Sequence, residues 1–289
     1  MKLLAIIVAC YPDAEVLKRN IGSFINYVDQ LLIWDNTPER VHPEQAGFAF
    51  LKDDKIHIYG NGQNEGIGYA LNQGVRYAAE NGFTHLLTMD QDSHFSGETF
   101  ASLVHALGNP NDPMAAGIAP YTYIQELTPP PGKEVKEITK TFDIITSGTI
   151  YTIEALKKNG CFRDDFFIDA IDTEYNLRIK KNGYHFLRIP EAVLLHRLGS
   201  IEMKKTRFRT IRCFNYSPMR CYYFARNHYI VCSAYPSAKR WFFYWKSFFY
   251  RNLSVVLFEC GKRKKTGAYF RGLYDGIRRK TGICKRYHR

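Results

Sequence analysis

Two carboxylates separated by one residue, Asp90 and Asp92, follow directly after an apolar run of the chain. The run from Thr84 to Met89 is typical of a buried strand, so both acids are expected at its carboxyl end. Ligands of open α/β sheets bind at the carboxyl ends of strands, and carboxylates there can share a hard divalent cation with a diphosphate. An Asp-x-Asp pair alone is weak, because Asp also caps helices and forms turns. Its meaning therefore depends on the elements around it.

The chain before these acids alternates between apolar runs of strand length and segments with helical spacing. The expected strands are 3–9, 30–34 and 55–59, and the expected helices are 14 to about 27, capped by Asp13, and 64 to about 81. Each strand ends in a polar loop. This alternation predicts an α/β fold with a mostly parallel central sheet, flanked by helices and carrying a nucleotide-sized crevice along one edge.

The second expected helix begins with a glycine-rich segment, Asn64-Glu65-Gly66-Ile67-Gly68. Such a start can approach a phosphate through backbone amides. The glycines can equally serve only to let the helix pack closely on the sheet. Both interpretations stay open at the level of this segment.

A second group of acids, Asp169, Asp172 and Glu174, lies near the start of a later helix. They can serve a reaction, or they can satisfy the helix N-terminus, with Glu174 paired to Arg178 four residues on. Beyond a strand at 184–189, His196 ends the apolar run 192–195, a position where a single histidine is usually structural. Residues 122–140, rich in Pro and charge, are expected to form a long exposed loop, as lids and binding loops do.

The charge of the 289-residue chain is concentrated near its end. Residues 239–289 hold 15 Lys and Arg against two acids, whereas the first 238 residues hold 25 basic and 26 acidic side chains. With 45% hydrophobic residues the chain can build a sizeable core. This pattern predicts a near-neutral globular domain with a basic tail that meets an anionic surface, either phospholipid or nucleic acid.

The cysteines and the apolar runs indicate where the protein works. Seven scattered cysteines without a Cys-x-x-Cys pair fit a reducing, cytoplasmic compartment. The run 3–10 lacks a cleavage site and is interpreted as a strand rather than a signal peptide. The longest apolar candidate, 241–258, is interrupted by Lys246 and Arg251, so no membrane span is predicted.

Several short segments taken together resemble a known family. They occur in the family's order within residues 3–200: 7–12, 35–36, 64–72, 89–93, 147–149 and 166–178. The chain resembles the inverting family 2 glycosyltransferases with a GT-A fold. The Asp-Gln-Asp-Ser form at 90–93 and the Phe-Ile-Asp-x-x-Asp-x-Glu form at 167–174 are similar to the rhamnosyltransferase-like branch.

The resemblance implies a role for each acidic group. Asp92 would ligate a metal directly, Asp90 would contact the ribose or the metal, and His196 would complete the coordination by Mn²⁺ or Mg²⁺, with the histidine favouring Mn²⁺. Asp172 would be the general base that activates the acceptor hydroxyl. Asp169 and Glu174 would bind or orient the acceptor. The nucleotide would meet the residues after the first strands: Tyr11, Asp13, Asp35, Asn64, Gly66, Asp90 and Gln91.

Two regions follow from the resemblance and the charge. Residues 1–202 are expected to form the GT-A catalytic domain, with a donor-binding half at about 1–95 and an acceptor-binding half at about 96–202. Residues 203–289 are expected to form a basic, aromatic-rich helical extension. A helix there would present one face to an anionic membrane interface: Trp241, Trp245, Phe248, Phe249, Val255 and Val256. Alternatively, these aromatics pack on the catalytic domain.

The predicted activity is transfer of a sugar, L-rhamnose from dTDP-rhamnose, to a lipid-linked or growing cell-surface polysaccharide. A polyprenyl-diphosphate-linked acceptor would place the enzyme peripherally on the inner face of the cell membrane, and a homo-oligomer is compatible with the sequence. The alternative donor is a UDP-hexose or another UDP-sugar. A non-enzymatic nucleic-acid-binding protein would explain the tail, but it leaves the ordered acidic segments without a role.

Overall fold

The computed structural model describes residues 1–38, 47–108, 112–124, 137–196, 199, 201–205, 207 and 210–287. The chain divides into two compact units: Met1–Phe162 with Tyr175–Arg197 form unit 1, and Arg163–Glu174 with Leu198–Arg289 form unit 2. The segment that contains the second acidic group therefore belongs to the same unit as the C-terminal region. The division falls within helix α5 (Ile171–Lys181).

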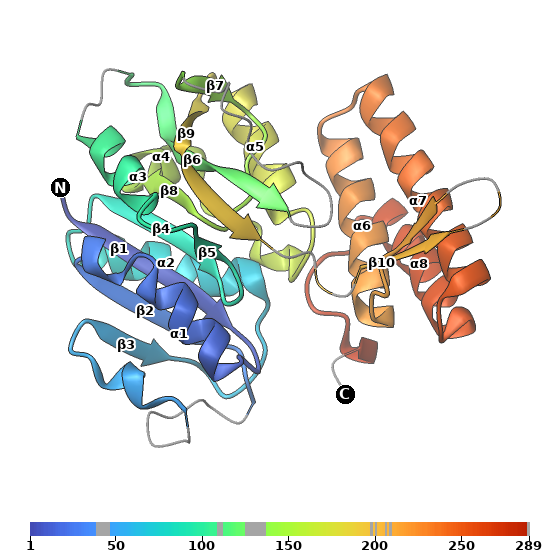
Figure 1. Cartoon of the computed structure of the whole chain (residues 1–289). Helices are drawn as coiled ribbons and strands as arrows, with labels where there is room; N and C mark the ends of the chain where they lie inside the picture. Colours follow the sequence, from blue (N-terminus) through green and yellow to red (C-terminus); the bar gives the residue numbers. More distant parts are fainter. Residues whose placement is uncertain are drawn as a thin grey trace. The chain divides into compact units, whose positions relative to one another are not determined.

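Unit 1 is built on one sheet, in the spatial order β3-β2-β1-β4-β8-β6-β9-β5 with β7 beside β9 (Figure 1). The pairings place β1, β2, β3, β4, β6 and β9 in one direction and β5, β7 and β8 in the other. The predicted α/β fold with a mostly parallel sheet is confirmed. The strands are β1 (Leu3–Ala9), β2 (Gln30–Asp35), β3 (Ile56–Tyr59), β4 (His85–Asp90), β5 (His94–Phe95), β6 (Ala115–Ile124), β7 (Thr139–Thr141), β8 (Thr149–Thr152) and β9 (His185–His196).

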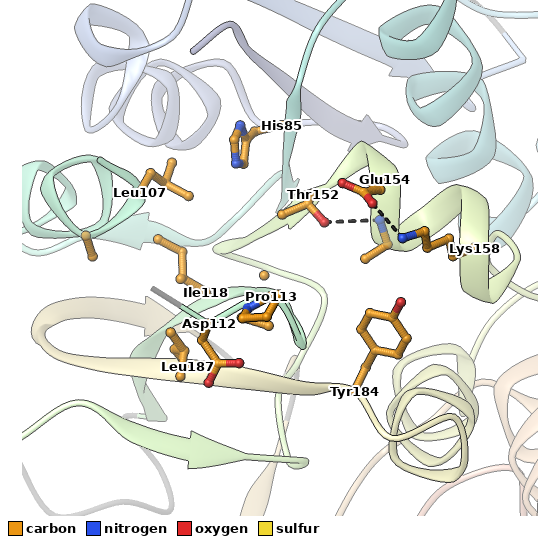
Figure 2. A pocket seen from close by; sticks show the side chains of 14 residues that line it. His85, Leu107, Asp112, Pro113, Ile118, Thr152, Glu154, Lys158, Tyr184 and Leu187 are labelled. Atoms are coloured by element: carbon orange, nitrogen blue, oxygen red, sulfur yellow. Dashed lines mark hydrogen bonds and ion pairs between the residues drawn. The ribbon is translucent and has the colours of Figure 1, made fainter. Parts of the chain in front are cut away.

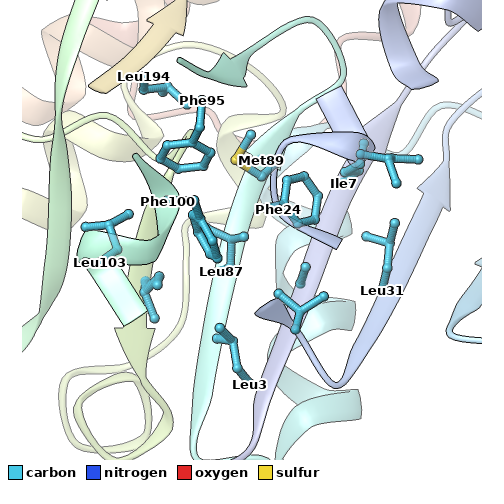
Figure 3. Packing of buried hydrophobic residues seen from close by; sticks show 14 of the residues in the cluster. Leu3, Ile7, Phe24, Leu31, Leu87, Met89, Phe95, Phe100, Leu103 and Leu194 are labelled. Atoms are coloured by element: carbon cyan, nitrogen blue, oxygen red, sulfur yellow. The ribbon is translucent and has the colours of Figure 1, made fainter. Parts of the chain in front are cut away.

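Helices flank this sheet and bury its central strands. They are α1 (Ala14–Gly22), α2 (Ile67–Glu80), α3 (Phe100–Leu107) and α4 (Ile153–Asn159), with 3-10 turns at Ile25–Tyr27 and Ala49–Lys52. Alternate residues of β1, such as Leu3 and Ile7, pack with Leu87 of β4 and Phe24 in one apolar cluster (Figure 3). Because the central strands are covered on both faces, their sequences are continuously apolar.

The first helix is shorter than predicted, and the correction has a local cause. α1 ends at Gly22 instead of continuing to about Tyr27. Phe24 leaves the helical region at φ −145° and is fully buried, and its ring lies 6.1 Å from that of Phe100. Burying this aromatic ring in the core outweighs one more helical turn.

The two apolar runs expected as separate segments, 184–189 and 192–196, form the single strand β9. The pairing of β6 with β9 shifts between Pro120 and Tyr121, which face Ile189 and Val193. This irregularity lets the strand continue through Pro190, which has no backbone N–H to donate. The expected long loop 122–140 is likewise trimmed, because Thr122 to Ile124 belong to β6 and Thr139 begins β7, while 125–136 lie outside the described residues.

The described residues of unit 2 form an antiparallel strand pair and the helices α6, α7 and α8, together with the start of α5, which confirms the helical C-terminal extension. Its elements are the 3-10 turn Asp164–Phe166, β10 (Glu202–Lys205), β11 (Thr210–Cys213), α6 (Pro218–Ala234), α7 (Ala238–Phe258), α8 (Lys262–Ile277) and a 3-10 turn Lys285–Tyr287. Aromatic side chains dominate its core, including Tyr223, Phe248 and Tyr269. A Cβ at Gly272 would lie 2.2 Å from the carbonyl oxygen of Tyr222, so only glycine allows α6 and α8 to pack this closely.

The apolar face predicted for α7 is partly wrong. Phe248 and Val255, expected at a membrane, are 1% and 2% exposed and belong to the core of unit 2. Ser254 of the same helix is also buried and donates a hydrogen bond to the carbonyl of Arg212. The richest aromatic face of the helix is therefore covered by its neighbours in unit 2. In the described part of the chain no helix combines the length and apolarity that crossing a bilayer requires.

Candidate active site

The structure brings Asp90, Asp92 and His196 together in unit 1. One potential ligand atom from each residue lies within 4.8 Å of the other two, and the described residues contain one such group. Nδ1 of His196 lies 3.8 Å from Oδ2 of Asp90. Two carboxylates supply the oxygen ligands that Mn²⁺ and Mg²⁺ prefer, and an imidazole favours a transition metal such as Mn²⁺, so these side chains can hold a divalent cation.

Strand register explains how a histidine more than a hundred residues away reaches the two acids. β5 pairs antiparallel with β9, and His94 faces Leu195. This register places Ser93 beside His196, and the Ser93 hydroxyl lies 2.7 Å from Nδ1 of the imidazole. A hydrogen bond of this kind fixes the orientation of a ligand histidine. His196 is thus a positioned member of the site rather than an isolated structural histidine.

Buried polar side chains hold the backbone of Asp90 in place. The side-chain amide of Asn20 donates to the carbonyl of Asp90 at 2.6 Å, and the N–H of Asp90 donates to the hydroxyl of Ser147 at 3.0 Å. Asn20 and Ser147 are both fully buried. Because the neighbouring backbone is fixed on both sides, the carboxylate projects from a rigid strand end.

The loops after β1, β2 and β3 form a connected network beside this group. Asp35 is buried and accepts from the N–H of Thr37, whose hydroxyl accepts from the N–H of Tyr11. Asn36 donates to the carbonyl of Gly66 and accepts from the N–H of Glu65. Three strand ends are therefore locked together at the carboxyl edge of the sheet, where a nucleotide would bind.

The remaining residues predicted for the nucleotide have distinct placements. Tyr11 is 70% exposed, so its ring is available to a ligand. Asn64 accepts from the N–H of Gly66, and Gln91 exchanges two hydrogen bonds with the backbone of Cys10. Asp13 accepts from the N–H of Val16, which confirms the prediction that it caps α1.

The second acidic group lies in unit 2, at the start of α5. Asp172 is partly exposed and accepts from the N–H and hydroxyl of Thr173. Glu174 is buried and accepts from the hydroxyl of Tyr235 at 2.8 Å. Asp169 pairs with the guanidinium of Arg220 at 3.4 Å. Asp169 and Glu174 thus have partners on or next to α6, whereas Asp172 presents its carboxylate at a partly open position.

The loop that leads to these acids has an unusual backbone. Phe167, Asp169 and Ala170 have φ of 65°, 66° and 64°, in the left-handed region that non-glycine residues rarely adopt. Each such residue costs on the order of 1 kcal/mol or more, so the surrounding structure must enforce the loop. Positions of this kind cluster at functional sites.

Two buried residues of α6, Arg226 and Asn227, hold the loop at 167–170 in this conformation. The side-chain amide of Asn227 donates to the carbonyls of Phe166, Ile168 and Asp169 at 2.8, 2.8 and 3.1 Å. The guanidinium of Arg226 donates to the carbonyls of Asp165, Phe166 and Gly282. The carbonyls of the loop thus find their hydrogen-bond donors on α6.

A cavity of about 210 Å³ in unit 1 lies elsewhere (Figure 2). His85, at the start of β4, lines it, whereas Asp90 ends the same strand. A six-residue strand is roughly 17 Å long, so the cavity is at the opposite edge of the sheet from Asp90, Asp92 and His196, which we call the metal group. Asp112 lies in its wall, and an ion pair with Lys140 helps to lower the pKa of this carboxyl to about 2. The cavity is not adjacent to the candidate site.

Comparison with known proteins identifies the class. Residues 5–166 match the model of glycosyl transferase family 2, and the chain belongs to this family. The dTDP-rhamnosyl transferase RfbF of Shigella flexneri is 30% identical over 246 residues, which cover 79% of each chain. The chain is thus a glycosyltransferase similar to a rhamnosyltransferase, as the resemblance of its motifs predicted.

Solved structures confirm the GT-A-like fold. The chain resembles GalNAc-T7 with UDP, GalNAc and Mn²⁺ with a TM-score of 0.60 and 14% identity, over 97% of this chain and 58% of that one. It also resembles the mannosyltransferase PcManGT from Pyrobaculum calidifontis in complex with GDP-Man and Mn²⁺, with a TM-score of 0.54 and 12% identity, over 96% and 88% of the two chains. The chain thus spans little more than half of the GalNAc-T7 chain. At these identities the likeness concerns the fold alone.

Sequence reasoning missed the residues that hold the acids. Asn20 carries no motif, and its role becomes visible only when α1 is packed on the sheet. Arg226 and Asn227 did leave a signal, since two adjacent polar residues interrupt a run of aromatic and apolar side chains in α6. Polar groups buried in a helix require partners, so this pair could have been singled out.

Proposed function

We propose that this protein is a metal-dependent, inverting glycosyltransferase that transfers a sugar from a nucleoside diphosphate to a saccharide acceptor. The observation that carries the proposal is the convergence of Asp90, Asp92 and His196 at the carboxyl edge of the sheet. The loops after β1, β2 and β3 lie at the same edge. Such an edge can bind a diphosphate, through a cation, and a nucleoside together.

On the donor side, Asp92, Asp90 and His196 would hold the divalent cation. A bound cation supplies positive charge to the departing diphosphate. Tyr11 would stack on the base, Asp35 would accept a ring N–H, and Asn64 with Gly66 would line the opposite side. Asp13 and Gln91 would also meet the nucleotide, and Gln91 fixes the backbone at Cys10. The residues of this chain thereby orient the sugar and expose its anomeric carbon.

On the acceptor side, Asp172 would take the proton of the acceptor hydroxyl as its oxygen attacks the anomeric carbon. The new carbon–oxygen bond forms on the face opposite the departing diphosphate, so the configuration inverts in one displacement. Thr173 donates to Oδ1 of Asp172, which orients the carboxylate. Asp169 and Glu174 would bind or orient the acceptor.

The donor we propose is dTDP-rhamnose. The similarity to a dTDP-rhamnosyl transferase over 79% of the chain supports this donor. A UDP-hexose or another UDP-sugar is the alternative, because the loop residues named above are compatible with either pyrimidine base.

The proposed acceptor is a lipid-linked or growing cell-surface polysaccharide, and the protein would act peripherally on the cytoplasmic face of the cell membrane. The basic character of unit 2 supports this placement, because residues 239–289 carry 15 Lys and Arg against two acids. A homo-oligomer is compatible with the proposal. Nucleic acid is not the proposed partner, because the proposed sugar transfer gives the acidic groups a role.

The test is calorimetric titration of dTDP-rhamnose and a panel of UDP-sugars into the full chain, with and without Mn²⁺. Binding of dTDP-rhamnose that requires Mn²⁺ and disappears in Asp92→Ala supports the proposal. Asp54→Ala, which removes an exposed acid of the same unit, is the matched control and should bind normally. Preference for a UDP-sugar would replace the donor, and the absence of any nucleotide binding would refute the proposed function.

A further inference from the structure

Unit 2 exposes an apolar stripe on α7 that its own core does not use. Phe242 and Phe249 are 63% and 62% exposed, and Leu253 and Val256 are also exposed. At about 100° per residue these four side chains fall on one side of the helix. The stripe differs from the buried face, which contains Phe248 and Val255.

Helix α8 continues this apolar surface. Phe270, Tyr274 and Ile277 are each about half exposed and follow the i, i+4, i+7 spacing of one helix face. The ring of Phe270 lies 5.7 Å from that of Phe248, and Phe248 lies 5.7 Å from Phe249. The exposed stripes of α7 and α8, adjacent helices in the orange and red part of Figure 1, therefore adjoin. We call them together the apolar face.

A basic hollow lies beside the apolar face on α8. Arg263, Lys264 and Arg271 of this helix line it together with Arg286, and Pro218, Gly267, Ala268 and Tyr287 complete its wall. On the helix the hollow is centred roughly a quarter turn from Phe270 and Tyr274. Cations and exposed apolar side chains thus occupy neighbouring sides of one element.

The four cations of the hollow have no acidic partner among the described residues. The two acids of this region are already engaged: Glu259 pairs with the buried Lys265 at 2.7 Å, and Asp275 pairs with Lys280 at 3.3 Å. Asp275 also accepts from the hydroxyl of Tyr222. Like charges that converge on one hollow repel each other, so an anion bound there would be stabilised.

We propose that the apolar face is a membrane-docking surface and that the basic hollow binds the phosphate of an anionic phospholipid headgroup. Aromatic and aliphatic side chains would enter the headgroup boundary while the cations meet lipid phosphate. This inference rests on the peripheral placement proposed above, and it does not depend on the donor or on the metal.

Charge selects this occupant over two others. A second copy of the chain would bring the same uncompensated cations into contact, which opposes association. Single-stranded RNA would satisfy the cations and could stack bases on the exposed rings, but it would leave the aliphatic side chains of Leu253, Val256 and Ile277 uncovered. A bilayer with anionic lipid matches both the apolar and the basic part of the surface.

The test is vesicle co-sedimentation of the full chain with phosphatidylcholine alone and with equal parts of phosphatidylcholine and phosphatidylglycerol. We expect the full chain to bind the anionic vesicles. Arg263→Gln/Arg271→Gln should bind them about 30-fold more weakly, because each basic residue near such a surface contributes on the order of 1 kcal/mol. Lys18→Gln/Arg19→Gln removes two exposed cations of unit 1 and is the charge-matched control, which should bind like wild type. Phe249→Ser/Phe270→Ser should also weaken binding, by about tenfold, through the lost apolar contact.

Several results would overturn the inference. Equal binding to both vesicle types, or an equal loss in the Lys18/Arg19 control, would exclude a specific headgroup site. Tight binding of soluble glycerol phosphate without vesicle binding would assign the hollow to a soluble phosphate, and tighter binding of RNA than of vesicles would assign it to nucleic acid. Dimerisation without vesicle binding would assign the apolar face to a second copy. Failure of Mn²⁺-dependent donor binding would refute the proposed metal-dependent use of the donor while leaving the vesicle result intact.

Discussion

The two acidic groups of this chain consist of similar side chains but are held in different ways. In unit 1, Asp90, Asp92 and His196 stand at strand ends, and the register of β5 against β9 brings them together. In unit 2, Asp169 lies in a loop with left-handed backbone angles and Asp172 follows it, and hydrogen bonds from α6 hold that loop. Strand register brings the first group together, and Asn20 and Ser147 then fix the backbone of Asp90. The second group has no strand end to place it and depends on donors from a neighbouring helix.

The largest effect is expected for the proposed base. Asp172→Asn should lower kcat for sugar transfer by about a thousandfold, because a positioned base contributes roughly 10²–10⁴-fold to such a step. Donor binding should persist, since the donor residues lie in unit 1. Asp164→Asn, at the start of the preceding 3-10 turn, is the matched control. Single-turnover kinetics with saturating donor measures the step, and near-normal transfer by Asp172→Asn would remove the assignment.

Loss of Asn227 should affect the acceptor side without affecting the donor side. Asn227→Ala leaves the carbonyls of Phe166, Ile168 and Asp169 without this donor, and we expect about 2–3 kcal/mol of destabilisation. At a temperature where the variant is folded, kcat should fall while Mn²⁺-dependent donor affinity stays unchanged.

The matched control for Asn227 is Asn252→Ala. Asn252 also donates from its side-chain amide, but to a single carbonyl within α7. It should retain kcat. If both variants lost transfer equally, or if Asn227→Ala lost donor binding too, Asn227 would have a general structural role.

Removal of the Ser93 hydroxyl should weaken the donor side without abolishing it. Ser93→Ala deletes the contact at 2.7 Å that orients His196, and such outer contacts are typically worth 10–100-fold in metal affinity. We expect Mn²⁺ affinity, measured by titration followed by electron paramagnetic resonance, to fall by about tenfold. Ser102→Ala on α3 is the control. Unchanged affinity in Ser93→Ala would show that His196 needs no such support.

A pH dependence of stability is also expected to arise in unit 2. Burial lowers the pKa of His228 to about 4, while the charge of Asp169 raises it and that of Arg251 lowers it. The unfolded chain, with an ordinary pKa of about 6.5, takes up this proton first, so stability should fall as the pH drops from about 6.5 to about 4, by at most about 3 kcal/mol.

His228→Gln should flatten this part of the stability curve. Urea denaturation at several pH values measures the effect, and His105→Gln on α3 of unit 1 is the control that should leave the slope unchanged. An identical slope in wild type and His228→Gln would assign the pH dependence to other groups.

The sequence was sufficient to predict the mostly parallel sheet and the position of Asp90 and Asp92 at a strand end, and the family resemblance added His196, which the fold brings beside them. Continuous apolar strands with acids at their ends reflect burial and chain direction, which are local properties. The ends of elements were less predictable, because α1 stops where Phe24 turns into the core and β9 continues where a bulge accommodates Pro190. The prediction of which face of α7 is exposed failed for a related reason. Helical periodicity shows that one face is apolar, but only the packed structure shows whether protein or another partner covers it.

The left-handed loop also has a consequence for the order in which the protein matures during synthesis. Asn227 follows Asp169 by 58 residues, so the loop leaves the ribosome before its donor exists. At roughly 5–20 residues per second this interval lasts several seconds. The metal group is complete in sequence once His196 has been made, before α6 is translated. A nascent chain would therefore gain the donor side first, and the proposed base would reach its final geometry only after most of the polypeptide had been translated.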